Sequence, residues 1–129
     1  MDDKTFSAQG MGHPVEGGRP DHRDAVDRSR RDRLSSADRK RLPIVRGVLD
    51  YFPDALLEVV TASLAGQSQH LNGEGLHWDR SKSTDEADAL VRHLLDRGKR
   101  DTDGVRHSAK VAWRALALLQ REIEAEEGR

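Results

Sequence analysis

The chain has 129 residues, of which 35% are charged and 35% hydrophobic, and it carries a net charge of −1. This length allows one domain with room for a tail, and the near-neutral charge gives no general reason to expect binding to nucleic acid or to an anionic membrane. The sequence contains no cysteine, which excludes disulfides, thiolate catalysis and cysteine-based zinc sites.

Residues 1–36 are expected to form a disordered tail. Glycine and proline punctuate the first twenty residues, a dense mixture of Arg and Asp follows, and the apolar residues keep no period. Such a segment cannot bury enough surface to offset its conformational entropy. The stretch 19–41 is locally basic, so it could contact phosphate, but a solvated linker is the interpretation that we favour.

Residues 37–129 are expected to form a helical domain, because apolar residues recur there at helical spacing in four runs. The runs are Ile44, Val45, Val48, Leu49 and Phe52; Leu56, Leu57, Val60 and Leu64; Ala87, Leu90, Val91, Leu94 and Leu95; and Ala112, Ala115, Leu116, Leu119 and Ile123. Pro53 can open the second run, while Gly66 and Gly98 close the second and third. No strand pattern of convincing length appears, so we predict an all-α bundle of three to four helices that bury these stripes against each other.

The polar segment 67–83 and the two following helix starts concentrate residues that can carry chemistry. They are His70, His77, Trp78, Asp79, Arg80, Lys82, Ser83, Asp85, Glu86, Asp88, Arg92, His93, Asp101, Asp103 and His107. Imidazole and carboxylate groups together suit a divalent metal, Arg and Lys beside Ser suit phosphate oxygens, and Trp offers a stacking face for a base. A nucleotide with its metal needs all three kinds of group.

Two histidines are expected to meet beside the last turn. His93 lies five residues before Gly98 and His107 three residues after Gly104, so antiparallel packing of the two helices places the histidines near each other. The plainer interpretation is that each is a cap or a surface residue. Trp113 lies off the main apolar stripe, and we read it as a core-edge residue. HExxH, P-loop and GxGxxG motifs are absent.

Four stretches carry a resemblance to a known family. They are YFPDALLEVV at 51–60, QHLNGEGLHWDRSKSTDEAD at 69–88, the Arg92–His93–Leu94 core of the third run, and DTDGVRHSAKVAWRALALLQ at 101–120. On these stretches, residues 42–120 resemble the phage and prophage family known as the dATP/dGTP diphosphohydrolase N-terminal domain. The resemblance implies an all-helical domain of phage nucleotide metabolism that removes pyrophosphate from dATP and dGTP with a divalent metal.

We therefore expect a nucleotide pyrophosphohydrolase-like phage protein that acts on purine deoxynucleoside triphosphates with Mg²⁺ or Mn²⁺. The expected metal ligands are His93, His107, Asp88 and Asp103, and the first three are also the expected catalytic residues. The residues expected to contact the nucleotide are Trp78, Arg80, Lys82, Ser83 and Arg92.

Two other functions are compatible with the same residues. One is a nucleotide-binding or partner-regulating module without turnover, and the other is an interaction protein whose basic tail docks on a phage or host complex. We expect no specific contact with nucleic acid. A bundle this small often buries its remaining apolar stripe in a homodimer. No apolar run spans a membrane and the amino terminus lacks a signal-peptide core, so the expected location is the cytoplasm, that of the host if the protein is phage-encoded.

Overall fold

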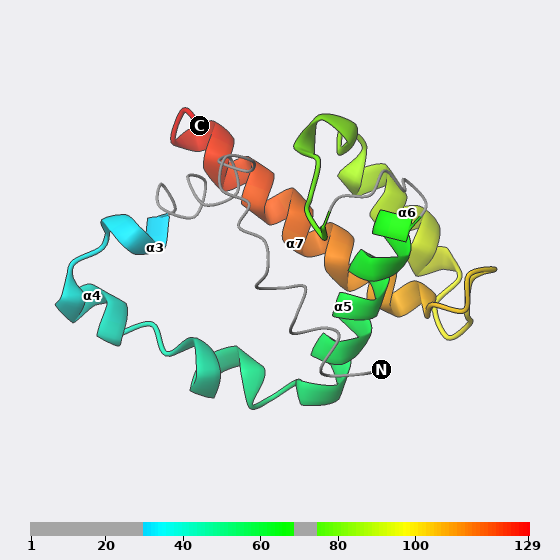
Figure 1. The fold of residues 1–129 in the computed structure, drawn as a ribbon, viewed down its shortest axis with the longest axis horizontal. Coiled ribbons are helices and arrows are strands. Elements are labelled where there is room, and N and C mark those ends of the chain that lie inside the picture. Colours follow the sequence, from blue (N-terminus) through cyan, green and yellow to red (C-terminus); the bar gives the residue numbers. More distant parts are fainter. Residues whose placement is uncertain (1–29, 69–74) are drawn as a thin grey trace. The chain divides into compact units, whose positions relative to one another are not determined.

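The computed structural model describes residues 30–68 and 75–129, and in this part of the chain the all-α class is confirmed (Figure 1). The elements are α3 (Arg30–Arg33), α4 (Ser36–Lys40), the π-helical segment η1 (Val45–Leu49), α5 (Pro53–Ser68), the 3₁₀-helical segment η2 (Arg80–Lys82), α6 (Glu86–Leu95) and α7 (His107–Glu126). His70 and the first 29 residues of the expected tail lie outside the described residues. Among the helices described, none is long and apolar enough to cross a membrane.

The chain divides into two compact units, Met1–Pro43 and Ile44–Arg129. The described part of the first unit holds the short helices α3 and α4. Ser35 caps α4 by accepting a hydrogen bond from the backbone N–H of Asp38 at 3.1 Å, as serine commonly does at a helix start. Neither helix buries a residue, so this part of the chain contributes no core.

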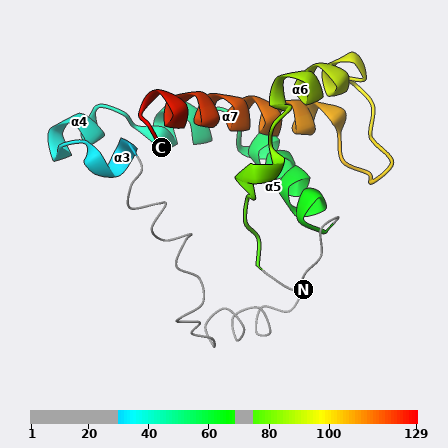
Figure 2. The ribbon, with the colours of Figure 1, turned by 90° about the horizontal axis from the view of Figure 1, so that it is seen from above.

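The second unit is organised around α7, the longest helix. Both α6 and α5 pack on it, and Figures 1 and 2 show α6 running beside the first part of α7 while α5 crosses it. The start of α6 is tied to the middle of α7 by an ion pair in which Arg114 donates to the buried Glu86 at 2.8 Å. α5 is tied to α7 by a hydrogen bond in which Trp113 Nε1 of α7 donates to Ser63 Oγ of α5 at 2.9 Å.

A tight hairpin joins α6 to α7 and reverses the chain. The backbone N–H of Asp101 donates to the carbonyl of Val105 at 2.8 Å, and that of Gly104 donates to the carbonyl of Asp101 at 2.9 Å. Gly104 has φ of +83°, which glycine adopts without the penalty that other residues meet. A turn closed by a residue in this conformation is a common three-residue hairpin loop. It brings the end of α6 against the start of α7.

The core is small, and here the structure differs from the sequence expectation. The buried apolar residues in the described part are Ala89, Val105, Ala109 and Ala117. The bulky stripe expected to be the buried face of α7 is instead exposed, with Leu116 at 55% and Leu119 at 53%. The reason is the short length of α6: its first residue, Glu86, pairs with Arg114, so α6 covers α7 only as far as its middle, and Leu116 and Leu119 lie beyond that point.

Candidate metal centre

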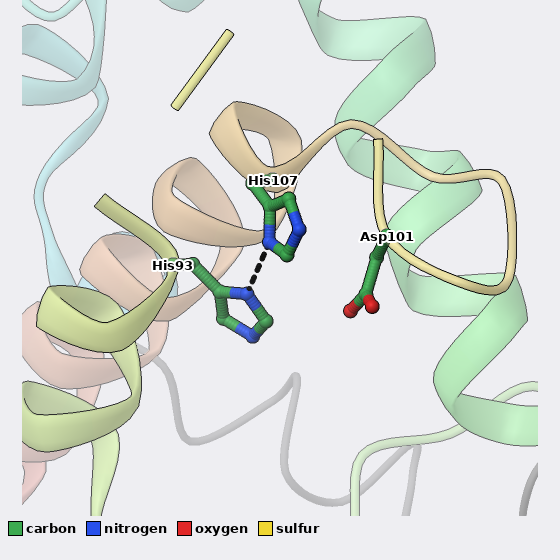
Figure 3. A group of neighbouring side chains, drawn as sticks. All are labelled: His93, Asp101 and His107. Carbon is green, nitrogen blue, oxygen red and sulfur yellow. Dashed lines mark hydrogen bonds between the residues drawn. The ribbon is translucent and has the colours of Figure 1, made fainter. Parts of the chain in front are cut away.

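The hairpin brings His93 and His107 together, which confirms their expected approach. His93 lies in the last turn of α6 and His107 is the first residue of α7. Their Nδ1 atoms are 2.9 Å apart and both side chains are half-buried (Figure 3). Two nitrogens that bind one ion at about 2.1 Å in neighbouring octahedral positions lie about 3.0 Å apart, so this spacing suits shared coordination.

Asp101 completes a group of three candidate ligands. One ligand atom from each of His93, Asp101 and His107 lies within 4.8 Å of the other two. Figure 3 shows the Asp101 carboxylate pointing from the hairpin toward the side on which the imidazoles lie. Two imidazoles and one carboxylate form a donor set that binds divalent transition metals, and three protein ligands leave positions open for water or substrate.

Asp88 and Asp103 are expected from the sequence to be ligands, and the structure places them differently. Asp88 is exposed and lies five residues before His93, which is about 140° around the helix. Asp103 is two residues beyond Asp101, and its carboxylate accepts the backbone N–H of Val105 at 3.0 Å. Neither belongs to the group that contains both imidazoles. Asp101 had been noted only as one of many acidic residues, because the residue spacing does not show which aspartate of the turn faces the histidines.

Lys110 holds the two hairpin aspartates. Its Nζ lies 2.7 Å from Asp101 Oδ2 and 2.8 Å from Asp103 Oδ2. The hydrogen bond from Lys110, followed by that from the Thr102 N–H, lowers the pKa of Asp101 to about 2, and Lys110 likewise lowers the pKa of Asp103. Burial works to lower the pKa of Lys110, but the two aspartates raise it above its ordinary value. Both carboxylates are therefore ionised at neutral pH.

His93 is held in the form that binds metals. Burial lowers its pKa first, and the positive charge of Lys110 and the neighbouring His107 lower it further, against an opposing effect of Asp101. A histidine with a lowered pKa is a neutral imidazole at neutral pH, and the neutral ring has a free nitrogen lone pair for a metal.

A second cluster, built around Trp78, fixes the segment 76–83 on α7. The indole Nε1 of Trp78 donates to the buried Ser83 Oγ at 2.8 Å, and the Trp78 ring meets Trp113 edge to face with centroids 5.7 Å apart. The Arg80 guanidinium lies 4.1 Å from the centroid of the Trp78 ring. Arg80 therefore covers one face of the Trp78 ring.

Arg80 is itself engaged by α7. It donates from Nε and Nη2 to the two carboxylate oxygens of Glu124, at 3.0 and 2.8 Å. Arg121 adds hydrogen bonds to the carbonyls of Arg80 at 3.0 Å and of Ser83 at 2.8 Å. Glu124 is buried, and the hydrogen bonds from Arg80 lower its pKa despite burial. The Arg80 guanidinium, which the sequence predicts to hold phosphate, is thus paired with the Glu124 carboxylate in this structure.

A cavity of about 950 Å³ lies between α5, α7 and the segment 76–83. Four of the five residues that the sequence assigned to the nucleotide line it, namely Trp78, Arg80, Lys82 and Ser83. His93, Asp101 and Lys110 line the same cavity. The fifth assigned residue, Arg92, is exposed, pairs with Asp85 at 3.1 Å and is not part of the lining.

Comparisons with known proteins add no relative. The chain matches no protein-family model, and neither the curated proteins nor the solved structures that were compared are significantly similar to it. The function is therefore argued from the site itself.

Proposed function

We propose that this protein is a metal-dependent phosphohydrolase that removes pyrophosphate from purine deoxynucleoside triphosphates. The observation that carries the proposal is the convergence of His93, Asp101 and His107, of which His93 and Asp101 line a large cavity. The donor set fits a divalent cation, because the carboxylate is ionised and the pKa of His93 is lowered. When bound there, such an ion supplies an acidified water molecule and neutralises phosphate charge.

The chemistry of the donors bears on which metal binds. Mg²⁺ prefers a shell of oxygens, whereas imidazole suits later transition metals. Of the two ions expected from the sequence, Mn²⁺ therefore fits this site better than Mg²⁺. Two histidines and one carboxylate also hold Fe²⁺ in oxygenases, so Zn²⁺ and Fe²⁺ belong in the panel of metals to be tested.

The cavity supports a substrate of nucleotide size. Ligand pockets usually measure roughly 300 to 1,000 Å³, and they combine apolar walls with a few polar groups. Trp113 lies three residues beyond Lys110 on α7, which is about 4.5 Å along the helix axis. The aromatic pair of Trp78 and Trp113 thus lies close to the candidate metal ligands, as a base requires when its phosphates reach the metal.

The proposed reaction consumes water. The water oxygen forms a bond to the α-phosphorus, the bond between that phosphorus and the bridging oxygen breaks, and the products are a deoxynucleoside monophosphate, pyrophosphate and a proton released to solvent. In this scheme His93, Asp101 and His107 hold the ion. Lys110 and Asp103 act as positioning residues, because they fix the Asp101 carboxylate.

The test is an assay of the full chain with the four deoxynucleoside triphosphates and each metal, in which pyrophosphate and monophosphate are quantified. We expect products from dATP and dGTP with Mn²⁺, and no products from His93→Ala. His77→Ala is the matched control, because His77 lines the same cavity but is not in the group of three ligands. If the protein binds dATP in the presence of the metal but leaves it intact, the proposed hydrolysis is wrong and a nucleotide-binding module is favoured.

A further inference from the structure

The second unit leaves its bulky apolar stripes uncovered. Leu57, Val60 and Leu64 on α5 are exposed, and so are Leu116 and Leu119 on α7. Each set repeats at helical spacing, which is the pattern of a face that packs against another element. Soluble chains rarely expose contiguous apolar patches of this kind unless they form an interaction site.

One part of this surface is concave. Val60 of α5 and Leu116, Leu119 and Ile123 of α7 line the cavity between the two helices. Leu119 and Ile123 lie 12 and 16 residues beyond His107, which is about 18 and 24 Å along the α7 axis. The cavity therefore continues from the candidate metal ligands into an apolar groove that the metal chemistry does not use.

The segment Ile44–Phe52 also exposes large apolar side chains that lack a partner surface among the residues that the structure describes. Its six large apolar side chains are all between 43% and 69% exposed, and η1 buries no residue. Helices this short are not stable in water by themselves, so a partner surface must support the segment. In the sequence, Val45, Val48, Leu49 and Phe52 follow the i, i+3, i+4, i+7 spacing of α-helices that dock in apolar grooves, so the segment, which is π-helical over Val45–Leu49 here, would present one apolar face as an α-helix.

We propose that the chain forms a symmetric dimer in which Ile44–Phe52 of each copy occupies the α5–α7 groove of the other. In such a reciprocal exchange each copy contributes one segment and one groove. Both surfaces are then covered in the dimer, and no further copies can be added. Phe52 and Pro53 connect the segment directly to α5, with the Leu56 N–H donating to the Phe52 carbonyl at 2.9 Å. The side chains of the segment and those of Val60, Leu116 and Leu119 are all exposed, so the segment does not fill the groove of its own chain, and a second copy is the occupant that supplies a matching surface.

The remaining segments of the same chain are poorer occupants. Residues 1–29 and 69–74 contain four large apolar side chains besides methionine, without a helical period: Phe6, Val15, Val26 and Leu71. A stripe that repeats at helical spacing is matched best by another helix.

The area is sufficient for a stable dimer. Half-burial of the six side chains of the segment and of Val60, Leu116 and Leu119 in both copies would hide on the order of 800 Å² of apolar surface. At roughly 60% apolar content this corresponds to an interface of roughly 1,300 Å², and stable interfaces begin at about 1,200 Å².

Sedimentation velocity of the full chain over a concentration series tests the dimer. We expect a dimer that Leu119→Glu dissociates, with dimer affinity weakened about 30-fold or more, since a charge is placed in the centre of the groove. Leu95→Glu is the matched control, because Leu95 is 73% exposed on α6 and lies outside the proposed interface. A chain that is monomeric at every concentration overturns the proposal, and so does equal dissociation by the two variants.

Crosslinking tests the exchange itself and does not depend on how the charged variants fold. The chain has no cysteine, so Val48→Cys with Leu119→Cys introduces the sole thiols. We expect oxidation to give a covalent dimer rapidly, while Val48→Cys with Leu95→Cys gives it slowly. Equal rates for the two pairs refute the exchange. Mn²⁺ binding by Leu119→Glu, measured by calorimetry, should be unchanged, which separates failure of the dimer from failure of the metal site.

Discussion

The two ends of the second unit are built on different principles. Where α6 meets α7, small residues pack closely and the polar side chains of the hairpin have partners, with Lys110 placed between Asp101 and Asp103. Where α5 and η1 lie, the large apolar side chains remain exposed. The polar groups of the first region are paired within one chain, although Val91, Leu94 and Leu95 of α6 are exposed, whereas in the dimer that we propose the second region is packed by the other copy. The proposed site and the proposed interface share one cavity, with the site at its polar part and the interface at its apolar part.

Among the variants that compare the two regions, Trp113→Ala is expected to have the largest effect on the free energy of unfolding. Trp113 contacts Trp78 and donates to Ser63, so its removal takes away the joint between α5, α7 and the segment 76–83. We expect a loss of about 3 kcal/mol in the free energy of unfolding. Leu57→Ala, at an exposed position of α5, should cost less than about 0.5 kcal/mol in a monomer. Urea denaturation followed by circular dichroism measures both, and comparable losses would show that the two regions do not differ.

Asp101→Asn should weaken Mn²⁺ binding by about 100-fold, because it removes the charged ligand beside the two histidines. Asp103→Asn should weaken binding only by about tenfold or less, because Asp103 acts through Lys110. Isothermal titration calorimetry with both variants sharpens the description of the metal end. The reverse order of affinities would restore the ligand assignment made from the sequence.

Gly104→Ala should cost about 1 kcal/mol in stability, because Gly104 holds φ at +83° in the hairpin. Gly47→Ala is the control in the other region, where a methyl group meets no atom within 4 Å and the φ of Gly47 is not positive. We expect that change to be neutral or slightly stabilising. Thermal melting of the two variants measures the difference. A Gly47 variant that melts at a lower temperature than the Gly104 variant would contradict the expected greater sensitivity of the hairpin between α6 and α7.

The smallest effect concerns pH. The pKa of Glu124 is lowered in the folded chain, chiefly by hydrogen bonds from Arg80. A lowered pKa gives stability that is present above the unfolded-state pKa and is lost as the pH falls through the folded-state value. Arg80→Met should therefore lose less stability than the parent chain when the pH falls from about 6 to about 3. Parallel urea titrations at several pH values provide the measurement, and identical pH dependence of the two proteins would remove Arg80 as the cause.

The sequence predicted the helices and the meeting of His93 with His107 because both follow from local rules. Helical period, proline and glycine mark the elements, and an antiparallel turn between two helices brings their adjoining ends together. Asp101 could not be chosen over Asp103 in the same way. Its position depends on backbone hydrogen bonds within the hairpin and on the φ of Gly104, which residue spacing does not reveal.

The apolar stripes show a second limit of sequence reasoning. Leu116 and Leu119 follow the expected period, yet they are exposed and lie beyond the part of α7 that α6 covers. A helical period shows that a face is apolar, but it does not show whether the same chain covers it. Trp78 is expected from the sequence to contact a base, and the structure adds its hydrogen bond to Ser83 and its place in the cavity wall.

The alanines between α6 and α7 have a consequence for the metal end. Ala89 and Ala109 are almost completely buried, and the distance between two packed helices depends on the size of the side chains at their contact. Because His93 and His107 stand on the two helices, the small size of Ala89 and Ala109 helps to set the distance between the two imidazoles. A larger side chain at either position would increase the distance between α6 and α7. One of the two imidazole nitrogens would then be too far away to bind a shared ion.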